Sequence, residues 1–92
     1  MIKITVEFFG IPRQRVGQAE VSVSLGNDQG TLAELLGQLS QEFSEFGDSC
    51  IVDRRLDPLY IANRDGEEFL TDPESILSDG DRILILSSEA GG

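Results

Sequence analysis

Two glycines end the sequence, while the side chains that usually carry covalent chemistry are scarce. Gly91 and Gly92 close the segment SSEAGG, no histidine occurs, and Cys50 is the only cysteine. The absence of histidine excludes Cys-His and Ser-His pairs and the usual zinc sites. A single cysteine excludes an internal disulfide and a cysteine-ligated iron–sulfur cluster. The glycine pair points to a role for the chain end, with a frayed tail or a cloning remnant as the alternative.

Carboxylates are plentiful, but their spacing does not predict a metal site or an acid/base pair. The stretches NRDGEEF and SDGDRI do not place oxygen ligands at EF-hand spacing, and each is typical of a turn between apolar segments. A glycosidase-type carboxylate pair needs a deep cleft, for which 92 residues leave little material. We therefore expect no bound metal and no independent small enzyme.

The charge balance limits the classes of partner. Seven basic and seventeen acidic residues give a net charge of −10, which would repel phosphate backbones and anionic lipids. Nucleic acid and membrane are thus excluded as expected partners, and both solubility and steering toward a basic protein surface stay open. The opening MIKITVEFFG alternates apolar and polar residues and resembles no secretory leader, so we expect a cytoplasmic protein.

The first half of the sequence predicts a hairpin followed by one helix. Alternation predicts strands over residues 2–9 and 21–25, joined by a loop over GIPRQRVGQ. Thr31 and Glu34 form a capping box before an apolar run, and Gly47 suits the left-handed position that ends a helix. The predicted helix carries one apolar stripe at helical spacing: Leu32, Leu35, Leu36, Leu39, Phe43 and Phe46.

The second half predicts short strands and turns. Residues 48–58 show no helical or strand periodicity and are interpreted as an irregular connection. Residues 59–63 and 67–70 are interpreted as strands on either side of a turn at RDG. One helical turn is predicted around Ile76 and Leu77, a tight turn at residues 79–81, and a last strand over RILIL. With the first and last strands adjacent, this order predicts an α+β β-grasp fold. We expect a domain over residues 1–86 and a flexible tail over residues 87–92.

The last strand is apolar on both faces, although one helix can cover only one of them. Ile83 and Ile85 alternate with Leu84 and Leu86, and Phe9 lies opposite the apolar face of the first strand. Phe9, Leu84 and Leu86 should therefore form an exposed apolar patch beside the tail. Such a patch usually marks a protein interface.

Three segments in this order resemble the MoaD/ThiS family of ubiquitin-like sulfur carriers, and most closely the small subunit of molybdopterin synthase. EFFGIPRQRVG is similar to the opening strand and loop of the family, IANRDGEEF to its third strand, and LSDGDRILIL to its acidic turn and last strand. The residues that carry the resemblance, besides the terminal glycines, are Phe8, Phe9, Gly10, Arg13, Gly17, Asn63, Asp79, Gly80 and Asp81.

The resemblance implies chemistry at the chain end. An ATP-dependent activating enzyme would adenylate the Gly92 carboxylate, and sulfur transfer would convert the adenylate to a thiocarboxylate. The segment Glu89, Ala90 and Gly91 would enter the partner's active site, since glycine can pass through a narrow channel. Family interface positions match Phe9 and Leu86, and Arg13 would meet an acidic residue of the activating enzyme. No cofactor is expected on the chain itself, because ATP is used by the partner.

The acceptor of the sulfur stays open. The leading expectation is molybdopterin synthesis, with the large subunit of molybdopterin synthase as the second partner. Ser87, Ser88 and Glu89 stand where the molybdopterin-type tail has prolines and an apolar residue. A carrier for tRNA thiolation, cysteine or thiamine synthesis, or a protein modifier, is therefore an alternative. A binding module from another class, with the same sheet patch and a passive tail, is also an alternative.

Overall fold

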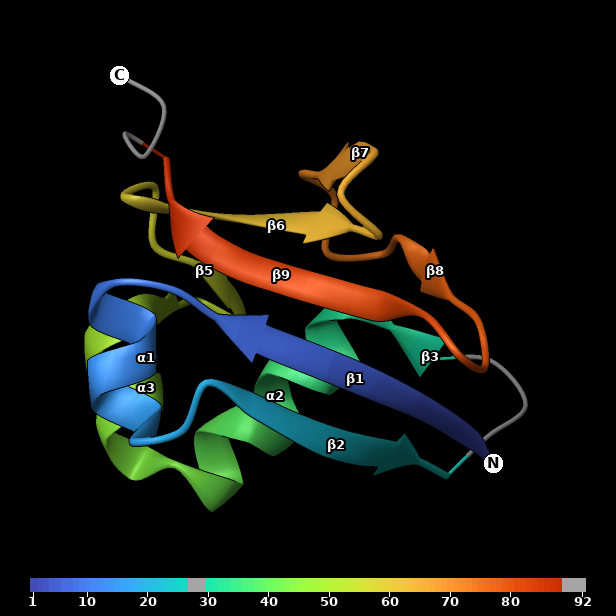
Figure 1. Cartoon of the computed structure of the whole chain (residues 1–92), viewed down its shortest axis with the longest axis horizontal. Helices are drawn as coiled ribbons and strands as arrows, with labels where there is room; N and C mark the ends of the chain where they lie inside the picture. Colours follow the sequence, from blue (N-terminus) through green and yellow to red (C-terminus); the bar gives the residue numbers. More distant parts are fainter. Residues whose placement is uncertain (27–29, 89–92) are drawn as a thin grey trace.

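The sheet is built around two strands from the two ends of the chain. We describe a computed structural model of the protein, covering residues 1–26 and 30–88. Strand β1 (Ile2–Phe8) runs parallel to β9 (Arg82–Ser87) in the middle of a five-stranded sheet of order β2-β1-β9-β6-β7 (Figure 1). The predicted adjacency of the first and last strands, and with it the β-grasp fold, is confirmed.

The remaining strands of this sheet pair antiparallel. Strand β2 (Glu20–Leu25) pairs with β1, while β6 (Tyr60–Arg64) lies between β9 and β7 (Glu68–Leu70). Two residues with positive φ, Asp65 (55°) and Gly66 (78°), make the tight turn between β6 and β7, as the RDG motif predicts. Each strand of the main sheet thus overlaps a segment that the sequence predicted to be a strand, and alternation of apolar and polar residues was the signal for β1 and β2.

Two small strand pairs lie outside the main sheet, and the sequence predicted neither. Strand β8 (Ile76–Leu77), predicted as a helical turn, is instead paired with β3 (Gly30–Thr31). The exposed Ile76 and the buried Leu77 follow the two-residue period of a strand. Strands β4 (Ile51–Val52) and β5 (Arg55–Leu56) form a hairpin in the segment predicted to be irregular.

The single predicted helix is divided in two. Helix α2 (Leu32–Glu42) begins at the Thr31 cap, whose hydroxyl accepts a hydrogen bond from the Glu34 backbone N–H (3.1 Å). The chain turns at Phe43 and continues as α3 (Ser44–Cys50), so the prediction that Gly47 ends the helix is wrong. A Cβ on Gly47 would lie 2.9 Å from the Ser40 Cβ. Gly47 therefore permits the close approach of α3 to α2.

The segment predicted as the first loop contains a short helix, α1 (Ile11–Val16). Pro12 lies in its first turn, and Gly17 closes it in the left-handed conformation (φ 82°), its N–H bonded to the Arg13 carbonyl at 2.8 Å. Proline near the start and glycine just after the end are typical helix boundaries. The loop prediction was wrong because Pro12 and Gly17 were interpreted as signs of an irregular segment, although they mark the two ends of a helix. A helix of fewer than two turns is too short to show its own period.

The core lies between the sheet and the helices, and its residues are almost completely buried. Phe46 of α3 packs edge-on against Phe8 of β1, with ring centroids 5.6 Å apart and an interplanar angle of 73°. Cys50 at the end of α3 is also buried. The largest fully buried side chains are Phe8, Phe46, Ile4, Leu35, Leu36, Leu39, Leu77, Ile83, Ile85, Val6, Val23 and Pro12.

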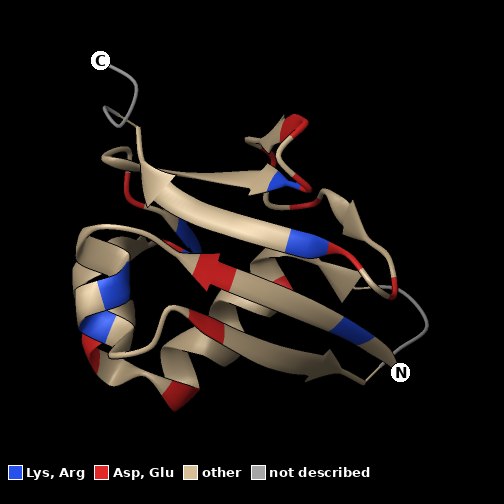
Figure 2. Cartoon of the chain, viewed as in Figure 1, with Lys and Arg blue, Asp and Glu red and all other residues tan. Residues whose placement is uncertain are grey.

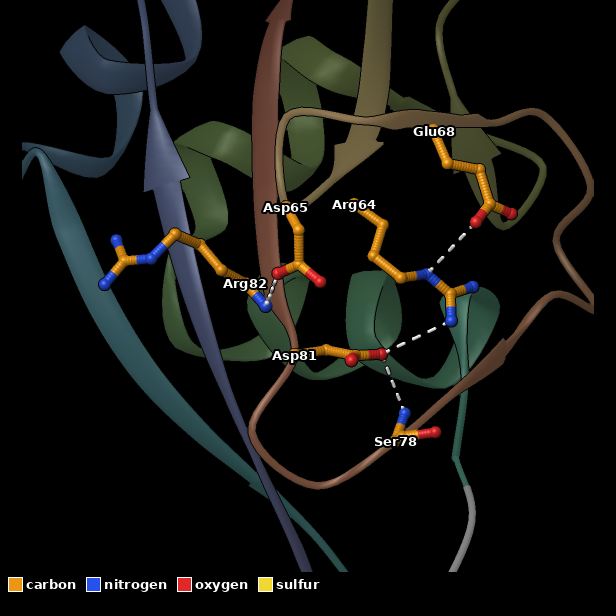
Figure 3. Close-up of polar contacts among 6 residues, drawn as sticks. All are labelled: Arg64, Asp65, Glu68, Ser78, Asp81 and Arg82. Carbon is orange, nitrogen blue, oxygen red and sulfur yellow. Dashed lines mark hydrogen bonds and ion pairs between the residues drawn. The ribbon is translucent and has the colours of Figure 1, made fainter.

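Carboxylates at the predicted acidic turn fix the start of β9. Asp81 Oδ2 accepts a hydrogen bond from the Ser78 backbone N–H (2.8 Å) and contacts Arg64 Nη1 (3.5 Å), while Asp65 Oδ1 accepts one from the Arg82 backbone N–H (3.0 Å) (Figure 3). Asp79 Oδ1 accepts another from the Lys3 backbone N–H (2.8 Å). These bonds hold the ends of β1, β6 and β9 together, and thereby set the position of the last strand.

Candidate functional site

The two faces of β9 differ in burial. Ile83 and Ile85 have an exposed fraction of 0%, because they face the helices, whereas Leu84 and Leu86 on the opposite face are half-buried. That opposite face, called the open face below, carries the side chains that alternate with the core residues. The structure thus places Leu84 and Leu86 on the same face, away from the helices.

Neighbouring strands add three apolar side chains to Leu84 and Leu86. The Phe9 backbone N–H donates to the Ile85 carbonyl (3.0 Å), which extends the strand pairing by one residue and sets Phe9 next to β9. Ile61 is paired with Leu86 across β6 and β9, and Phe69 stands on the next strand with 60% of its surface exposed. We call this set the open-face patch: Phe9, Ile61, Phe69, Leu84 and Leu86.

Sequence reasoning missed two members of the open-face patch. Ile61 and Phe69 lie on strands that were predicted, but the pairing of β6 with β9 was not assigned, so their faces were not known. The alternation within 67–70 would have put Phe69 opposite Leu70, which is buried. The sequence therefore predicted that these strands exist, but it did not predict their order in the sheet.

The other half of the open face is polar. Arg82 extends from the start of β9 to Glu7 of β1 and to Glu20 of β2, with 2.9 Å between Arg82 Nη1 and Glu20 Oε1. Hydrogen bonds to Glu20 and Glu7 raise the pKa of the Arg82 guanidinium. Within β9 the charge is confined to Arg82 at its start, and the rest of the strand is drawn without blue or red in Figure 2. On the neighbouring β1, Glu7 is paired with Leu84.

The end of β9 is anchored next to the open-face patch. Ser88 donates its backbone N–H to the Leu59 carbonyl (2.8 Å) and its hydroxyl to the Pro58 carbonyl (3.1 Å). These bonds fix the point at which the chain leaves the sheet. The predicted tail residues Glu89, Ala90, Gly91 and Gly92 lie outside the described residues.

Arg13 is exposed on α1, which lies beside the end of β9 (Figure 1). Among residues 1–26 and 30–88 its guanidinium makes neither a hydrogen bond nor an ion pair. In a chain with seventeen acidic residues, such an arginine keeps its full capacity to pair with a carboxylate of another molecule. The structure therefore brings Arg13 to the same end of the sheet as Phe9 and Leu86.

Cys50 is not placed to act as a surface nucleophile. Its thiol is fully buried, and burial raises its pKa in spite of hydrogen bonds to Ser49 and Tyr60. A thiol with a raised pKa supplies little thiolate at neutral pH. Cys50 therefore packs as a small apolar residue.

A groove of about 250 Å³ beside β5 and β6 is lined mainly by apolar residues, with Arg55, Tyr60 and Thr71 as its polar side chains and no carboxylate. In the two described ranges, no group of three His, Cys, Asp or Glu side chains is arranged to hold a metal ion. Nor is any helix within them long and apolar enough to cross a membrane.

Solved structures share this architecture over nearly the whole chain. Small archaeal modifier protein 1 of H. volcanii superposes with a TM-score of 0.80 at 16% identity, covering 95% of this chain and 98% of that one. A protein described as molybdopterin converting factor, subunit 1, of Pyrococcus furiosus gives 0.77 at 18%, with 95% and 98% covered. A chain of the BexX/CysO complex of Amycolatopsis orientalis gives 0.70 at 23%, with 97% and 99% covered.

The class that the fold defines is that of the small ubiquitin-like β-grasp proteins. The structural neighbours are of the MoaD/ThiS kind, and the MoaD/ThiS resemblance of the sequence fits them. No protein-family model and no curated protein sequence matches the chain. At these identities the likeness shows the fold, and the function has to be argued from the chain itself.

Proposed function

We propose that the protein is a sulfur carrier whose C-terminal glycine is adenylated and then converted to a thiocarboxylate. One observation carries the proposal: β9 contributes Leu84 and Leu86 to the open-face patch and leads, within a few residues, into the Gly-Gly segment. A partner that docks on the patch can therefore receive the chain end in its own active site. Carriers and modifiers of this kind among the structural neighbours support the proposal.

The chemistry takes place at Gly92 and needs no reactive side chain of this protein. A carboxylate oxygen of Gly92 attacks the α-phosphorus of ATP and releases pyrophosphate, which leaves an acyl adenylate. A sulfide nucleophile from a donor then attacks the carbonyl carbon and displaces AMP. The carried sulfur becomes the nucleophile of the next reaction, so the chain end takes the role that an activated cysteine has elsewhere. ATP and the catalytic groups belong to the activating enzyme.

The segment before Gly92 suits insertion. Glycine lacks a Cβ and adopts backbone conformations closed to other residues, so Gly91 and Gly92 can enter a channel that a bulkier segment could not. Ala90 is the next smallest side chain, and Glu89 would lie at the entrance. The anchoring of Ser88 to Pro58 and Leu59 leaves four residues to reach the partner's active site, about 14 Å when extended.

We propose two protein partners, both in the cytoplasm, where ATP is available. The first is the adenylating enzyme, which contacts the open-face patch and offers a carboxylate to Arg13. The second accepts the sulfur. Molybdopterin synthesis is our leading destination, with the large subunit of molybdopterin synthase as acceptor, and a molybdopterin converting factor subunit among the structural neighbours supports it. Delivery for tRNA thiolation, cysteine or thiamine synthesis is the alternative.

The intact mass of the protein tests the proposal. After incubation with the activating enzyme of its host, ATP and a sulfide donor, the mass should rise by the difference between one sulfur and one oxygen atom. Fragmentation should localise the increase to Gly92. A variant that lacks Gly92, and a matched variant with one alanine added after it, should stay unloaded and folded. Loading of either variant would rule out chemistry at the Gly92 carboxylate.

A protein modifier is the second candidate, because small archaeal modifier protein 1 has the same fold. In that case the Gly92 adenylate would be attacked by an amine, and conjugates of higher mass would appear in cells. Deletion of Gly91 and Gly92 distinguishes a carrier or modifier, which would lose its function, from a binding module with a passive tail. In a binding module without tail chemistry, partner binding would survive this deletion and would be lost in Phe9→Ala or Leu86→Arg.

A further inference from the structure

Asn63 is a polar residue with apolar neighbours on both adjacent strands of the open face. On β6 it is paired with Leu84 of β9 on one side and with Phe69 of β7 on the other, so the three side chains form one row across the open face. Only 7% of Asn63 is exposed, and it is the single buried polar residue in the described parts of the chain. A recognition group at this position would be flanked by Leu84 and Phe69 of the open-face patch.

The Asn63 amide oxygen lacks a hydrogen-bond partner within the described residues. This Oδ1 is shielded from solvent, yet it accepts no hydrogen bond from any of residues 1–26 and 30–88. Buried polar side chains normally have a hydrogen-bond partner, and leaving one unpaired destabilises the folded state. Leucine has the same branched shape without this cost. The free protein therefore gains no stability from the amide.

The surroundings would allow the amide to be reached from outside. Phe69, which flanks it on one side, is 60% exposed. Leu84, on the other side, is half-buried. A shift of these two side chains against a docking surface would uncover Oδ1 without any change in the backbone. Oδ1 would then accept a hydrogen bond in a site from which water is excluded, where such a bond is strongest.

We propose that Asn63 is the recognition residue for the activating enzyme, whose surface brings one main-chain N–H into the open-face patch to pair with Oδ1. The inference rests on the proposed function. The path of the chain supports the activating enzyme as the partner. Strand β9 supplies Leu84 to this row and ends at Ser87, from where the tail must enter the adenylation site. The enzyme that holds the tail therefore stands against the row that contains Asn63.

The apolar side chains beside Asn63 make this hydrogen bond selective among possible partners. A competing surface that is apolar throughout would bury Oδ1 without a donor, and is therefore disfavoured relative to a surface with a donor at that position. Asn63 thus selects among partners, whereas the five apolar residues of the patch supply the contact area.

The test compares Asn63→Leu with the wild-type protein in two measurements. Chemical denaturation should show that N63L is as stable as wild type or more so, because an unpaired amide has been removed. In sulfur loading by the host's activating enzyme, N63L should raise KM for the carrier about 10-fold at unchanged kcat, the effect of one lost hydrogen bond in uniform binding. Thr5→Val, an isosteric change on the polar half of the open face, is the matched control and should leave KM unchanged.

A second variant identifies the partner group. Asn63→Thr keeps an uncharged oxygen acceptor near the position of Oδ1, so its KM should lie below that of N63L. A KM equal to or above that of N63L would overturn the proposed N–H. An unchanged KM in N63L, or a loss of its stability, would overturn the inference while normal loading of the wild type upheld the carrier function. Failure of the wild type to load would overturn both.

Discussion

Strand β9 presents two pairs of large aliphatic side chains, and the two pairs differ in what covers them. Ile83 and Ile85 are enclosed by the helices, whereas Leu84 and Leu86 face outward. Burial on the covered face removes apolar surface from water in the folded chain itself. On the open face the same gain is left for association with another molecule. The difference shows that one strand can serve stability and recognition through alternate residues.

The largest effect is expected from Phe46→Ala on the covered face. The ring is fully buried against Phe8, so its removal leaves a cavity and should lower the free energy of unfolding by about 3–5 kcal/mol. Urea denaturation followed by circular dichroism measures this. Phe69→Ala, the matched loss of a phenyl ring on the open face, should cost much less. Equal losses would mean that the open face is covered in the free protein.

Leu86→Arg should show the opposite pattern. The side chain points outward beside Ile61, so the folded state should lose less than about 1 kcal/mol, as is usual for surface changes. Binding to the activating enzyme should weaken by about 2 kcal/mol, or roughly 30-fold, because a charge is brought into the centre of an apolar interface. Titration calorimetry gives the affinity, with Ser24→Arg on the polar half as control. A similar loss in both variants would show that charge alone is responsible.

Two glycines on the covered side should respond to alanine with opposite signs. Gly37 lies within α2 with open space around its Cβ position, so Gly37→Ala should raise stability by about 0.5–1 kcal/mol. Gly47→Ala would bring a Cβ within 2.9 Å of Ser40 and should destabilise by about 1–3 kcal/mol, as overpacking does. Thermal unfolding of both variants checks the pair. A stabilised Gly47→Ala would mean that α3 can move away from α2.

The smallest effect is a loss of stability in alkaline solution. Burial raises the pKa of Cys50 above its ordinary value of 9.0, so above about pH 9 the unfolded chain releases a proton that the folded chain retains. Stability is therefore complete below that pH and falls as the pH rises through the pKa of the folded state. Denaturation midpoints of wild type and Cys50→Ala between pH 8 and pH 10.5 should converge. Parallel curves would assign the loss to another group, with Tyr60 as the next candidate.

The strands of the main sheet were predictable because their residue patterns are local, whereas the two small strand pairs and the breaks between elements depend on tertiary packing. Nothing at Phe43 predicts the end of α2, since the apolar stripe continues to Phe46. The β4–β5 hairpin turns through Asp53 and Arg54 with positive φ (51° and 67°), positions where glycine or asparagine would have given the usual signal. These features arise from contacts between segments distant in the sequence.

The same distinction holds for the candidate site. Phe9, Leu84 and Leu86 could be grouped from the sequence, because alternation within two strands fixes their faces. Ile61, Asn63 and Phe69 required the order β9-β6-β7, which no local pattern supplies. Asn63 entered the sequence argument as part of a family resemblance, and its unpaired amide is visible only where β6 lies between two apolar neighbours.

The parallel arrangement of β1 and β9 has a practical consequence for immobilised assays. Lys3, the only lysine of the sequence, lies near the start of β1, and the C-terminal segment leaves from the opposite end of β9 (Figure 1). Amine coupling through this side chain would attach the molecule to a sensor surface by one end of its sheet. The Ser88 end of the sheet would then lie away from the point of attachment, so a lysine-directed linker gives an oriented array without an engineered tag.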